Sequence, residues 1–435
     1  RVYRMAVDFA FSDDGGRSWR AGMVGIHEDY HGMWIDPNDP EHFIVGGDAG
    51  IFQTWDKGGT YDAVNNMAMG QFYGISYDFQ VPYRVCGGLQ DNGSSCGLSR
   101  RAGAPLQMTD WFAIFAADGL QTAQDPFNPD YVYYESQGGN IARRNVATGE
   151  VLSVKARTVT RAQFGQQIAR IRGTGTTPLT PEQTKSIADI RGQMKKELAD
   201  PNVATRWNWN TPFILSRHDA NVLYSGAEKL FKSVKKGEEP YAISPDLSSR
   251  DESRIRITTG FDIDGNPAVD ATGGITRDAT GAEENATIVT IAESPFKAGV
   301  LYVGTNDGKV WLTKNDGGAW EEKSVGIANN YIRSISPSNF KTARVYMCMT
   351  GINYDDLHSY IYVSENYGSD WKNISAGLPD EPINVIKEDP TNENILYAGG
   401  LRTVYVSMDK GNTWSTLGKD MPQVAIADLE IHTPT

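Results

Sequence analysis

Short apolar runs recur along the whole chain, and each is bounded by turns rich in Gly, Asp, Asn and Pro. Residues 43–47, 301–305 and 395–399 are examples, and their length and β-branched or aromatic content are typical of buried strands. The runs return with a period of about 40 to 50 residues, which indicates a propeller or a solenoid. Within each unit the pattern predicts four strands, with a recurring turn between the third and the fourth. We therefore predict an all-β propeller of about seven or eight four-stranded blades.

The recurring turn has the pattern S/T-x-D-x-G-x-S/T-W, known as an Asp box. Residues 407–414 and 12–19 are full copies, and residues 54–61 keep everything except the indole. Weaker copies stand at 313–320 and 364–371. The Asp carbonyl oxygen can accept backbone N–H groups within the turn, Gly supplies a positive φ, and the aromatic residue starts the next strand. Each copy is thus predicted to close a β-hairpin, with its aromatic ring packed between neighbouring sheets.

The acid of this turn is predicted to be structural rather than catalytic. Glycosidases do use paired carboxylates, which makes a recurring Asp a tempting candidate. Here, however, Lys235, Asn315 and Asn366 take the place of the acid while parts of the surrounding pattern persist. A residue that serves folding in every repeat is a poor candidate for chemistry that is performed once.

The pattern gives seven complete units between about residues 31 and 418, with a partial unit at each end. Two units, at about 70–100 and 111–150, have no Asp box. Residues 424–432 have the pattern of an innermost strand, and residues 1–20 supply later strands and a full Asp box. Joined, these ends would form one composite blade that closes a ring and hides the edge strands. The alternative is that each end belongs to further blades outside this sequence.

Two stretches interrupt the repeat. Residues 155–205 contain the capping signal Thr180-Pro181, and apolar residues follow at helical spacing from Ile187 to Leu198. This predicts a helical insertion, which we expect to pack on the outside of a propeller that spans residues 1–435. The polar, Gly-rich stretch at residues 248–284 predicts a long or poorly ordered loop.

Composition narrows the range of functions. The formal net charge of −13 argues against a nucleic-acid surface, since phosphate binding needs clustered Lys and Arg. No run of about 18 apolar residues occurs in the sequence, so we predict no membrane span.

Cys86 and Cys96 flank a turn and could meet across a hairpin, whereas Cys348 lies in an apolar run and is predicted to be a buried thiol.

Six further stretches lie outside the Asp boxes, at residues 27–37, 71–73, 87–93, 134–139, 207–212 and 243–247. They resemble a bacterial family of large secreted proteins, described as BNR-repeat glycosyl hydrolases or as sortilin-like. The resemblance implies a two-propeller layout, of which this chain would be the C-terminal portion, and a secreted, cell-surface or periplasmic location. Glu28 and Tyr30 depart from the family's H-G-D-H-H pattern, and the arginine triad and Tyr–Glu pair of true sialidases are missing, so sialidase activity is not expected.

Four acids are candidate catalytic residues. Propellers bind ligands at one end of the central channel, where loops from several blades meet, so turns that depart from the repeat are the places to search. Asp48, Asp91, Asp118 and Glu135 lie in Gly-flanked turns of three successive units. Two of them could serve as general acid and as nucleophile or base if these turns share one face. The alternative is that each is simply a favourable turn residue.

Further polar residues are candidate ligand contacts. In an extended segment His27, Asp29 and His31 point to the same side, where they could hold a ligand or a divalent metal, or simply form a hydrogen-bonded entry to a strand. We predict no metal and no other cofactor. Residues 207–210 alternate aromatic and amide side chains, which suit sugar binding, because the rings can stack on sugars and the amides can hydrogen-bond to them. The aromatic residues could equally be buried between blades. The remaining candidates are Gln90, Asn92, Gln137, Trp207, Asn208, Trp209 and Asn210.

Two functional classes therefore stay open. We favour a binding or scaffold module that engages a glycan or protein partner at the channel mouth. The alternative is a glycoside hydrolase that uses two of the four acids. The two classes differ in whether two carboxylates converge in an open, aromatic-lined cleft, and the sequence does not indicate the oligomeric state.

Overall fold

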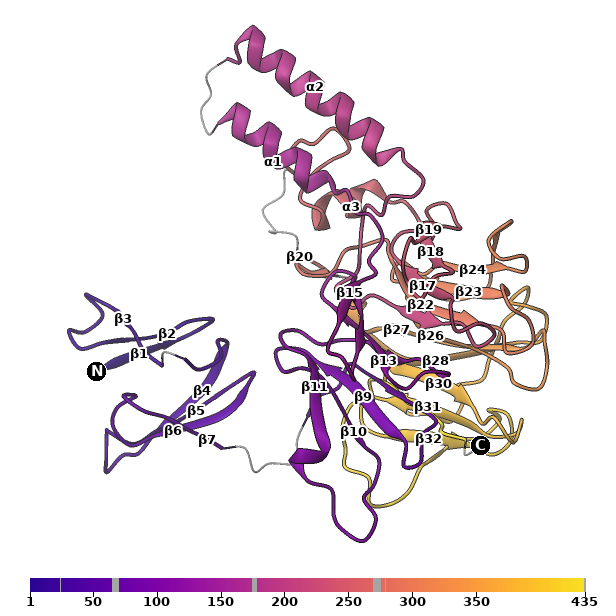
Figure 1. Cartoon of the computed structure of the whole chain (residues 1–435), viewed down its shortest axis with the longest axis horizontal. Coiled ribbons are helices and arrows are strands. Elements are labelled where there is room, and N and C mark those ends of the chain that lie inside the picture. The colour runs from indigo at the N-terminus through magenta and orange to yellow at the C-terminus, as the bar shows by residue number, and fades with distance from the viewer. Residues whose placement is uncertain (24, 65–69, 174–177, 269–274, 278, 434–435) are drawn as a thin grey trace. The chain divides into compact units, whose positions relative to one another are not determined.

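In a computed structural model the chain forms two compact units. Unit 1 comprises residues 1–71 and 89–92, and unit 2 comprises residues 72–88 and 93–435. Figure 1 shows the elements in chain order. The structure describes residues 1–23, 25–64, 70–173, 178–268, 275–277 and 279–433.

Seven antiparallel four-stranded sheets follow one another in the described part of the chain, and in each sheet the strands pair in sequence order. Unit 1 holds one of them, made of β4 (Tyr30–Ile35), β5 (Phe43–Gly47), β6 (Gly50–Thr54) and β7 (Asp62–Ala63). It also holds a three-stranded sheet of β1 (Val2–Met5), β2 (Phe9–Ser12) and β3 (Arg20–Ala21).

The other six sheets form the blades of unit 2. The first blade consists of β8 (Gly74–Tyr77), β9 (Arg84–Leu89), β10 (Gly93–Leu98) and β11 (Trp111–Phe115). The second consists of β12 (Thr122–Gln124), β13 (Tyr131–Ser136), β14 (Asn140–Asn145) and β15 (Val151–Ser153). The third consists of β16 (Phe213–Leu215), β17 (Leu223–Gly226), β18 (Leu230–Ser233) and β19 (Tyr241–Ala242). The fourth blade consists of β22 (Ile288–Glu293), β23 (Leu301–Thr305), β24 (Val310–Thr313) and β25 (Glu321–Glu322). The fifth consists of β26 (Tyr331–Pro337), β27 (Val345–Gly351), β28 (Asp356–Ser364) and β29 (Lys372–Asn373). The sixth consists of β30 (Ile383–Glu388), β31 (Leu396–Gly400), β32 (Val404–Ser407) and β33 (Ser415–Thr416). The fold is an all-β propeller of about eight blades, as the repeat predicted.

The core of unit 2 lies between the faces of neighbouring sheets. Strand β27 shows why its apolar run is continuous, since all seven of its residues are buried. Tyr346 and Cys348 pack towards the β30–β33 blade, whereas Met347 and Met349 pack towards the β22–β25 blade. A strand that is covered on both faces needs apolar side chains at successive positions.

The repeated turns are held by bonds from their own side chains. Ser407 Oγ accepts the Gly411 N–H at 2.8 Å, and Asp409 Oδ1 accepts the Thr413 N–H at 2.8 Å. Lys410 and Gly411 both have positive φ, at 60° and 84°. The turn between β32 and β33 therefore closes as the sequence pattern predicted.

Copies that lack the acid keep the same turn. Asn315 and Asn366 each accept a backbone N–H from the residue four positions later, both at 2.9 Å. In the copy with Lys235, Ser233 Oγ still accepts the Gly237 N–H, at 3.1 Å. The acid of the Asp box is thus a turn-forming group, which agrees with the structural interpretation.

Residues 424–432 join the last blade of unit 2 to the first. The Ile426 N–H donates to the Gly400 carbonyl at 2.9 Å, and the Asp428 carboxylate accepts the Ile75 N–H at 3.0 Å. The segment is not a strand, and the sheet of β1–β3 has three strands, none of which comes from it. The predicted composite blade is therefore wrong, because the C-terminal segment makes these hydrogen bonds within unit 2.

The helical insertion consists of α1 (Arg161–Arg172) and α2 (Pro181–Leu198), which lie side by side (Figure 1). Each helix begins with a capping box, from Thr160 and from the predicted Thr180. Phe164 and Met194 belong to the small core of this insertion. None of the helices in the described residues has the length and apolar character that a membrane span requires.

The stretch at 248–284 is more ordered than expected. It contains α3 (Glu252–Thr258), whose first residue forms a two-pronged ion pair with Arg161 of α1. The short strands β20 (Ile275–Thr276) and β21 (Ala279–Thr280) also lie in it, whereas residues 269–274 and 278 fall outside the described residues. A seven-residue helix is too short for helical spacing to reveal it.

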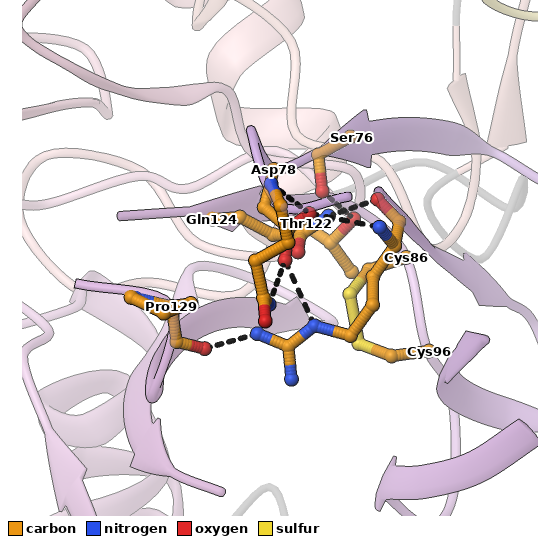
Figure 2. Close-up of a disulfide and its surroundings, with 9 residues drawn as sticks. Ser76, Asp78, Cys86, Cys96, Thr122, Gln124 and Pro129 are labelled. Atoms are coloured by element: carbon orange, nitrogen blue, oxygen red, sulfur yellow. Dashed lines mark hydrogen bonds and ion pairs between the residues drawn. A yellow bond between two sulfur atoms is a disulfide. The ribbon is translucent and has the colours of Figure 1, made fainter. Parts of the chain in front are cut away.

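The disulfide between Cys86 and Cys96 joins β9 to β10, which confirms the predicted bridge (Figure 2). In the same view the Ser76 and Thr122 hydroxyl groups meet at 2.9 Å and connect β8 to β12. Cys348 is fully buried, as predicted, and burial raises the pKa of its thiol to about 12.

One predicted unit boundary is wrong. The sequence pattern places residues 111–115 in the unit at about 111–150, but they form β11 and pair with β10 of the preceding blade. This blade has a long connection between its last two strands, so its sequence period differs from that of its neighbours.

Candidate functional site

Seven of the predicted residues come together at one end of the β12–β15 and β16–β19 blades. Asp118 precedes β12, Glu135 lies near the end of β13 and Gln137 lies in the turn that follows, while residues 207–210 run towards β16. The Gly138 N–H donates to the Trp209 carbonyl at 3.0 Å, which ties the two blades together at this point.

The turn after β13 approaches the next blade closely because it contains two glycines. Gly138 and Gly139 have positive φ, at 65° and 74°. A Cβ on Gly139 would lie 2.4 Å from the ring of Trp207, so only glycine fits there. The sequence Gln137-Gly138-Gly139 therefore positions the polar groups on either side of it.

Five partly exposed side chains form what we call the amide cluster: Asp118, Gln121, Gln137, Trp209 and Asn210. The Asp118 carboxylate accepts a hydrogen bond from the Gln137 amide, and the Gln121 amide donates to Asn210 Oδ1 at 3.0 Å. The cluster offers amide donors, amide and carboxylate acceptors, and an indole ring. Sequence reasoning found four of these residues and missed Gln121, whose only signal is its place directly before an innermost strand.

Glu135 lies beneath this cluster and has no exposed surface. Its Oε1 accepts the Gly139 N–H at 3.2 Å, while Oε2 has no partner among the described residues. Burial raises the pKa of Glu135 well above its ordinary value, and backbone N–H groups and the Lys155 charge only partly oppose this effect. A carboxyl group in this state cannot reach a sugar, so Glu135 and Asp118 do not form the open pair of acids that a hydrolase requires.

Lys155 is a neighbour that the sequence did not single out. Its ammonium group donates to the Gly138 carbonyl at 2.7 Å and to Asn140 Oδ1 at 3.1 Å. Burial lowers the pKa of Lys155, and the charge of Glu135 opposes that change. Lys155 thus supports the turn after β13 from below.

Trp207 and Asn208 are buried and hold the blades together. The Trp207 indole N–H donates to Thr158 Oγ1 at 2.9 Å, and the Asn208 amide donates to Thr287 Oγ1 at 3.0 Å. Within the stretch 207–210, only Trp209 and Asn210 present partly exposed side chains.

The other predicted residues lie in unit 1. Carboxylate oxygens of Asp29, Asp48 and Asp91 lie within 4.8 Å of one another. His31 Nε2 contacts Asp48 Oδ1 at 2.5 Å, and the Asn92 amide donates to the Asp48 carbonyl at 3.1 Å. Three carboxylates at this spacing could hold a hard divalent cation such as Ca²⁺. Exposed acids often cluster without one, so the group by itself does not indicate a metal site.

The expected alignment of His27, Asp29 and His31 is wrong. Asp29 has a φ of 66°, so the segment is not extended and its side chains do not alternate regularly. His27 Nδ1 contacts the Glu28 carbonyl at 3.0 Å. Neither histidine belongs to the group of three acids found among the described residues. Gln90 lies in the turn with Asp91 and Asn92, where its carbonyl accepts the Asn92 amide at 3.1 Å.

The chain matches no protein-family model, and no curated protein sequence matches it. Solved structures that resemble it are β-propellers. The WD40 propeller domain of Doa1 has 11% identity and a TM-score of 0.47, with 83% of this chain and 86% of that one covered. YCF48 from Cyanidioschyzon merolae has 12% identity and a TM-score of 0.43, with 88% and 96% covered. The propeller domain of Myceliophteria thermophila Cps50 (Swd1) has 11% identity and a TM-score of 0.43, with 88% and 95% covered.

Proposed function

We propose that this chain is a β-propeller binding module that engages a glycan or protein partner through the amide cluster. One observation carries the proposal: three segments that lack the Asp box meet at one end of two neighbouring blades. Asp118 and Gln121 come from the first of these segments, Gln137 from the second, and Trp209 and Asn210 from the third. Loops that converge in this way are where propellers bind their ligands.

A glycan is the partner that the chemistry favours. Sugar hydroxyls need donors and acceptors in close succession, and their apolar ring faces stack on aromatic rings. The amide cluster contains both kinds of group: the partly exposed Trp209 ring, and the amides and carboxylate of the Gln121–Asn210 and Asp118–Gln137 pairs. A protein surface rich in polar side chains would use the same groups.

We further propose a secreted, cell-surface or periplasmic location. The Cys86–Cys96 disulfide supports it, because such bonds persist in oxidising compartments and are rare in the cytosol. The resemblance to secreted BNR-repeat and sortilin-like proteins points the same way.

A glycan array with the purified chain tests the proposal. Trp209→Ala and Gln137→Ala should each weaken binding at least about tenfold, since each removes a main contact. Phe127→Ala is the matched control, because Phe127 is an exposed aromatic residue in the turn at the other end of β12. No captured glycan, or equal losses in all three variants, would contradict glycan binding at this cluster.

The same experiment separates binding from hydrolysis. The wild-type chain is incubated with each captured glycan, and the reducing ends released are measured beside Asp118→Asn. A binding module releases none. Release that disappears in Asp118→Asn would replace this proposal with the hydrolase alternative.

A further inference from the structure

A cavity of about 360 Å³ lies at the opposite end of the innermost strand β8 from the amide cluster. It is formed where the β8–β9 turn meets the segment after β10 and the C-terminal segment of residues 424–432. The lining residues that matter here are Phe79, Val81, Tyr83, Ser99, Arg100 and His432. None of them belongs to the predicted sites.

One wall of this cavity is aromatic and fixed in place. The His432 ring stacks on Tyr83, with ring centroids 4.1 Å apart and planes inclined by 16°. His432 also meets the edge of Tyr77, whose hydroxyl donates to the Ile431 carbonyl at 3.0 Å. The wall is therefore formed by contacts within the chain and needs no ligand to assemble it, which lowers the cost of binding.

The rim carries exposed apolar side chains. Phe79 is 43% exposed and Val81 is 86% exposed, and both line the cavity. Apolar side chains gathered around a concave surface indicate a binding site for an apolar group. A sugar would leave much of this apolar surface without a matching partner.

Arg100 gives the cavity a positive charge. Within the described residues its guanidinium has no carboxylate partner, whereas the adjacent Arg101 is paired with Asp110 at 3.5 Å and Arg84 with Asp78 at 2.8 Å. Other described arginines, such as Arg170 and Arg172, also have no carboxylate partner in the structure, but Arg100 is the arginine that lines this cavity. Arginine binds carboxylates through two parallel N–H bonds, so the ligand is expected to carry one.

We propose that this cavity binds an apolar or aromatic group that bears a carboxylate, presented by a peptide segment of a partner protein. The apolar group lies between Phe79, Val81 and the Tyr83–His432 wall, and the carboxylate pairs with Arg100. The site is independent of the amide cluster, so failure of the proposed function leaves it untouched. Because His432 comes from the C-terminal segment, an occupied cavity also stabilises the attachment of that segment to β8.

N-acetyl-L-phenylalanine is a probe of this chemistry, and N-acetyl-L-phenylalaninamide is its uncharged counterpart. Titration followed by calorimetry or ligand-detected NMR should show the acid binding at least about tenfold more tightly than the amide, as the loss of a charge-assisted pair implies. Arg100→Gln should abolish that difference, and Phe79→Ala should weaken the binding of both compounds. Bound acid should also raise the thermal midpoint of unfolding.

Two control variants resemble the test variants in type and exposure. Arg101→Gln removes a neighbouring arginine that already has a partner, and Phe127→Ala removes an exposed phenylalanine from the corresponding turn of the next blade. Both should bind N-acetyl-L-phenylalanine like the wild type. All four positions are on the surface, and circular dichroism checks that each variant is folded.

Three results would overturn the proposal. The first is equal binding of the acid and the amide by the wild type. The second is an equal loss in Phe127→Ala and Phe79→Ala. The third is binding of D-glucuronate as tight as that of N-acetyl-L-phenylalanine, which would assign the cavity to an acidic glycan instead of a peptide.

Discussion

Trp414 donates its indole N–H to the backbone carbonyl of Ile374 at 2.8 Å. Trp414 stands at the end of the last Asp box, and Ile374 directly follows the outermost strand of the preceding blade. Trp371 bonds to Lys323 in the same way at 2.8 Å. Trp371 and Trp414 therefore each join their blade to the one before, in agreement with the predicted packing of these aromatic residues between neighbouring sheets.

Replacing Trp414 by Phe should lower the free energy of unfolding by about 1 to 2 kcal/mol, because the ring is largely kept while the Ile374 carbonyl loses its donor. Urea unfolding monitored by circular dichroism measures this loss. Trp19→Phe serves as the control, since the Trp19 indole N–H has no acceptor among the described residues. Equal losses in both variants would show that ring size, and not the hydrogen bond, is responsible.

Substitution of Ser407 tests how much the hydroxyl group of the Asp box contributes to stability. It is fully buried and accepts the Gly411 N–H, so Ser407→Ala leaves a buried donor unpaired and should cost about 1 to 3 kcal/mol. Ser407→Thr should be nearly neutral, because Thr54 and Thr313 make the corresponding bonds at 2.9 and 3.0 Å in other copies. A large loss in Ser407→Thr would contradict the equivalence of these turns.

The disulfide should raise the free energy of unfolding by about 2 to 3 kcal/mol, because it closes a short loop in the unfolded chain between two cysteines whose sequence separation is 10. The expected result is a lower thermal midpoint for the wild type in the presence of a reductant. The double variant Cys86→Ser, Cys96→Ser should unfold at that lower temperature with or without reductant. An unchanged midpoint on full reduction would show that the bridge does not stabilise the folded chain.

The parts of the fold that the sequence predicted are those held by local bonds. Ser407, Asp409 and Gly411 form a turn by contacts within five residues, so their order along the chain was sufficient. Strand β27 was equally clear, because burial on both faces produces an uninterrupted apolar run.

The errors concern residues whose conformation depends on distant partners. Residues 424–432 alternate like a strand, yet the Ile75 N–H is taken by the side chain of Asp428 and not by a backbone carbonyl. Trp111 was placed in the wrong blade because its pairing with Gly97 spans a long connection.

The candidate site was predicted in part for the same reason. Gln137, Trp209 and Asn210 lie in turns that visibly depart from the repeat. Gln121 and Lys155 act through contacts with residues far along the chain, which sequence order does not reveal.

Stability should depend on pH through Glu284. Burial raises the pKa of this carboxyl group from its ordinary value of 4.5 to about 7, against the opposing effects of Arg206, Thr258 and Arg161. The folded state therefore holds a proton that the unfolded state releases, so the stabilisation is present below pH 4.5 and is lost as pH rises through about 7. The free energy of unfolding should fall by about 3 kcal/mol as a result.

Chemical unfolding of Glu284→Gln between pH 5 and 8 checks this expectation. The variant should show a smaller decline in stability than the wild type over this range; Glu135, whose pKa burial also raises, still contributes to the decline that is left. Glu239→Gln is the control, because its side chain is 74% exposed, and it should follow the wild type. A wild-type profile that stays flat up to pH 8 would rule out the proposed proton uptake.

The C-terminal segment of residues 424–432 takes the place of an innermost strand, and Gly399 tests this arrangement. A Cβ on Gly399 would lie 2.6 Å from Ile426 Cγ2. Two complete blades have the same relationship, in which a Cβ on Gly226 or Gly304 would lie 2.6 or 2.5 Å from Ile288 or Ile332 of the next innermost strand. The backbone agrees, since the N–H groups of Ile288 and Ile426 donate to the carbonyls of Ala227 and Gly400 at 2.8 and 2.9 Å.

The same Cβ would also lie 2.6 Å from Val385 Cγ1 of β30. Gly399→Ala should therefore displace the C-terminal segment or the Val385 side chain and cost about 1 to 3 kcal/mol, as overpacking does. Gly46→Ala is the control, because a Cβ there meets no atom within 4 Å and φ is not positive. If Ile426 is the residue that is displaced, Ile426→Ala combined with Gly399→Ala should cost less than the two single changes together. Strict additivity in this double-mutant cycle would mean that the segment does not occupy the position of an innermost strand.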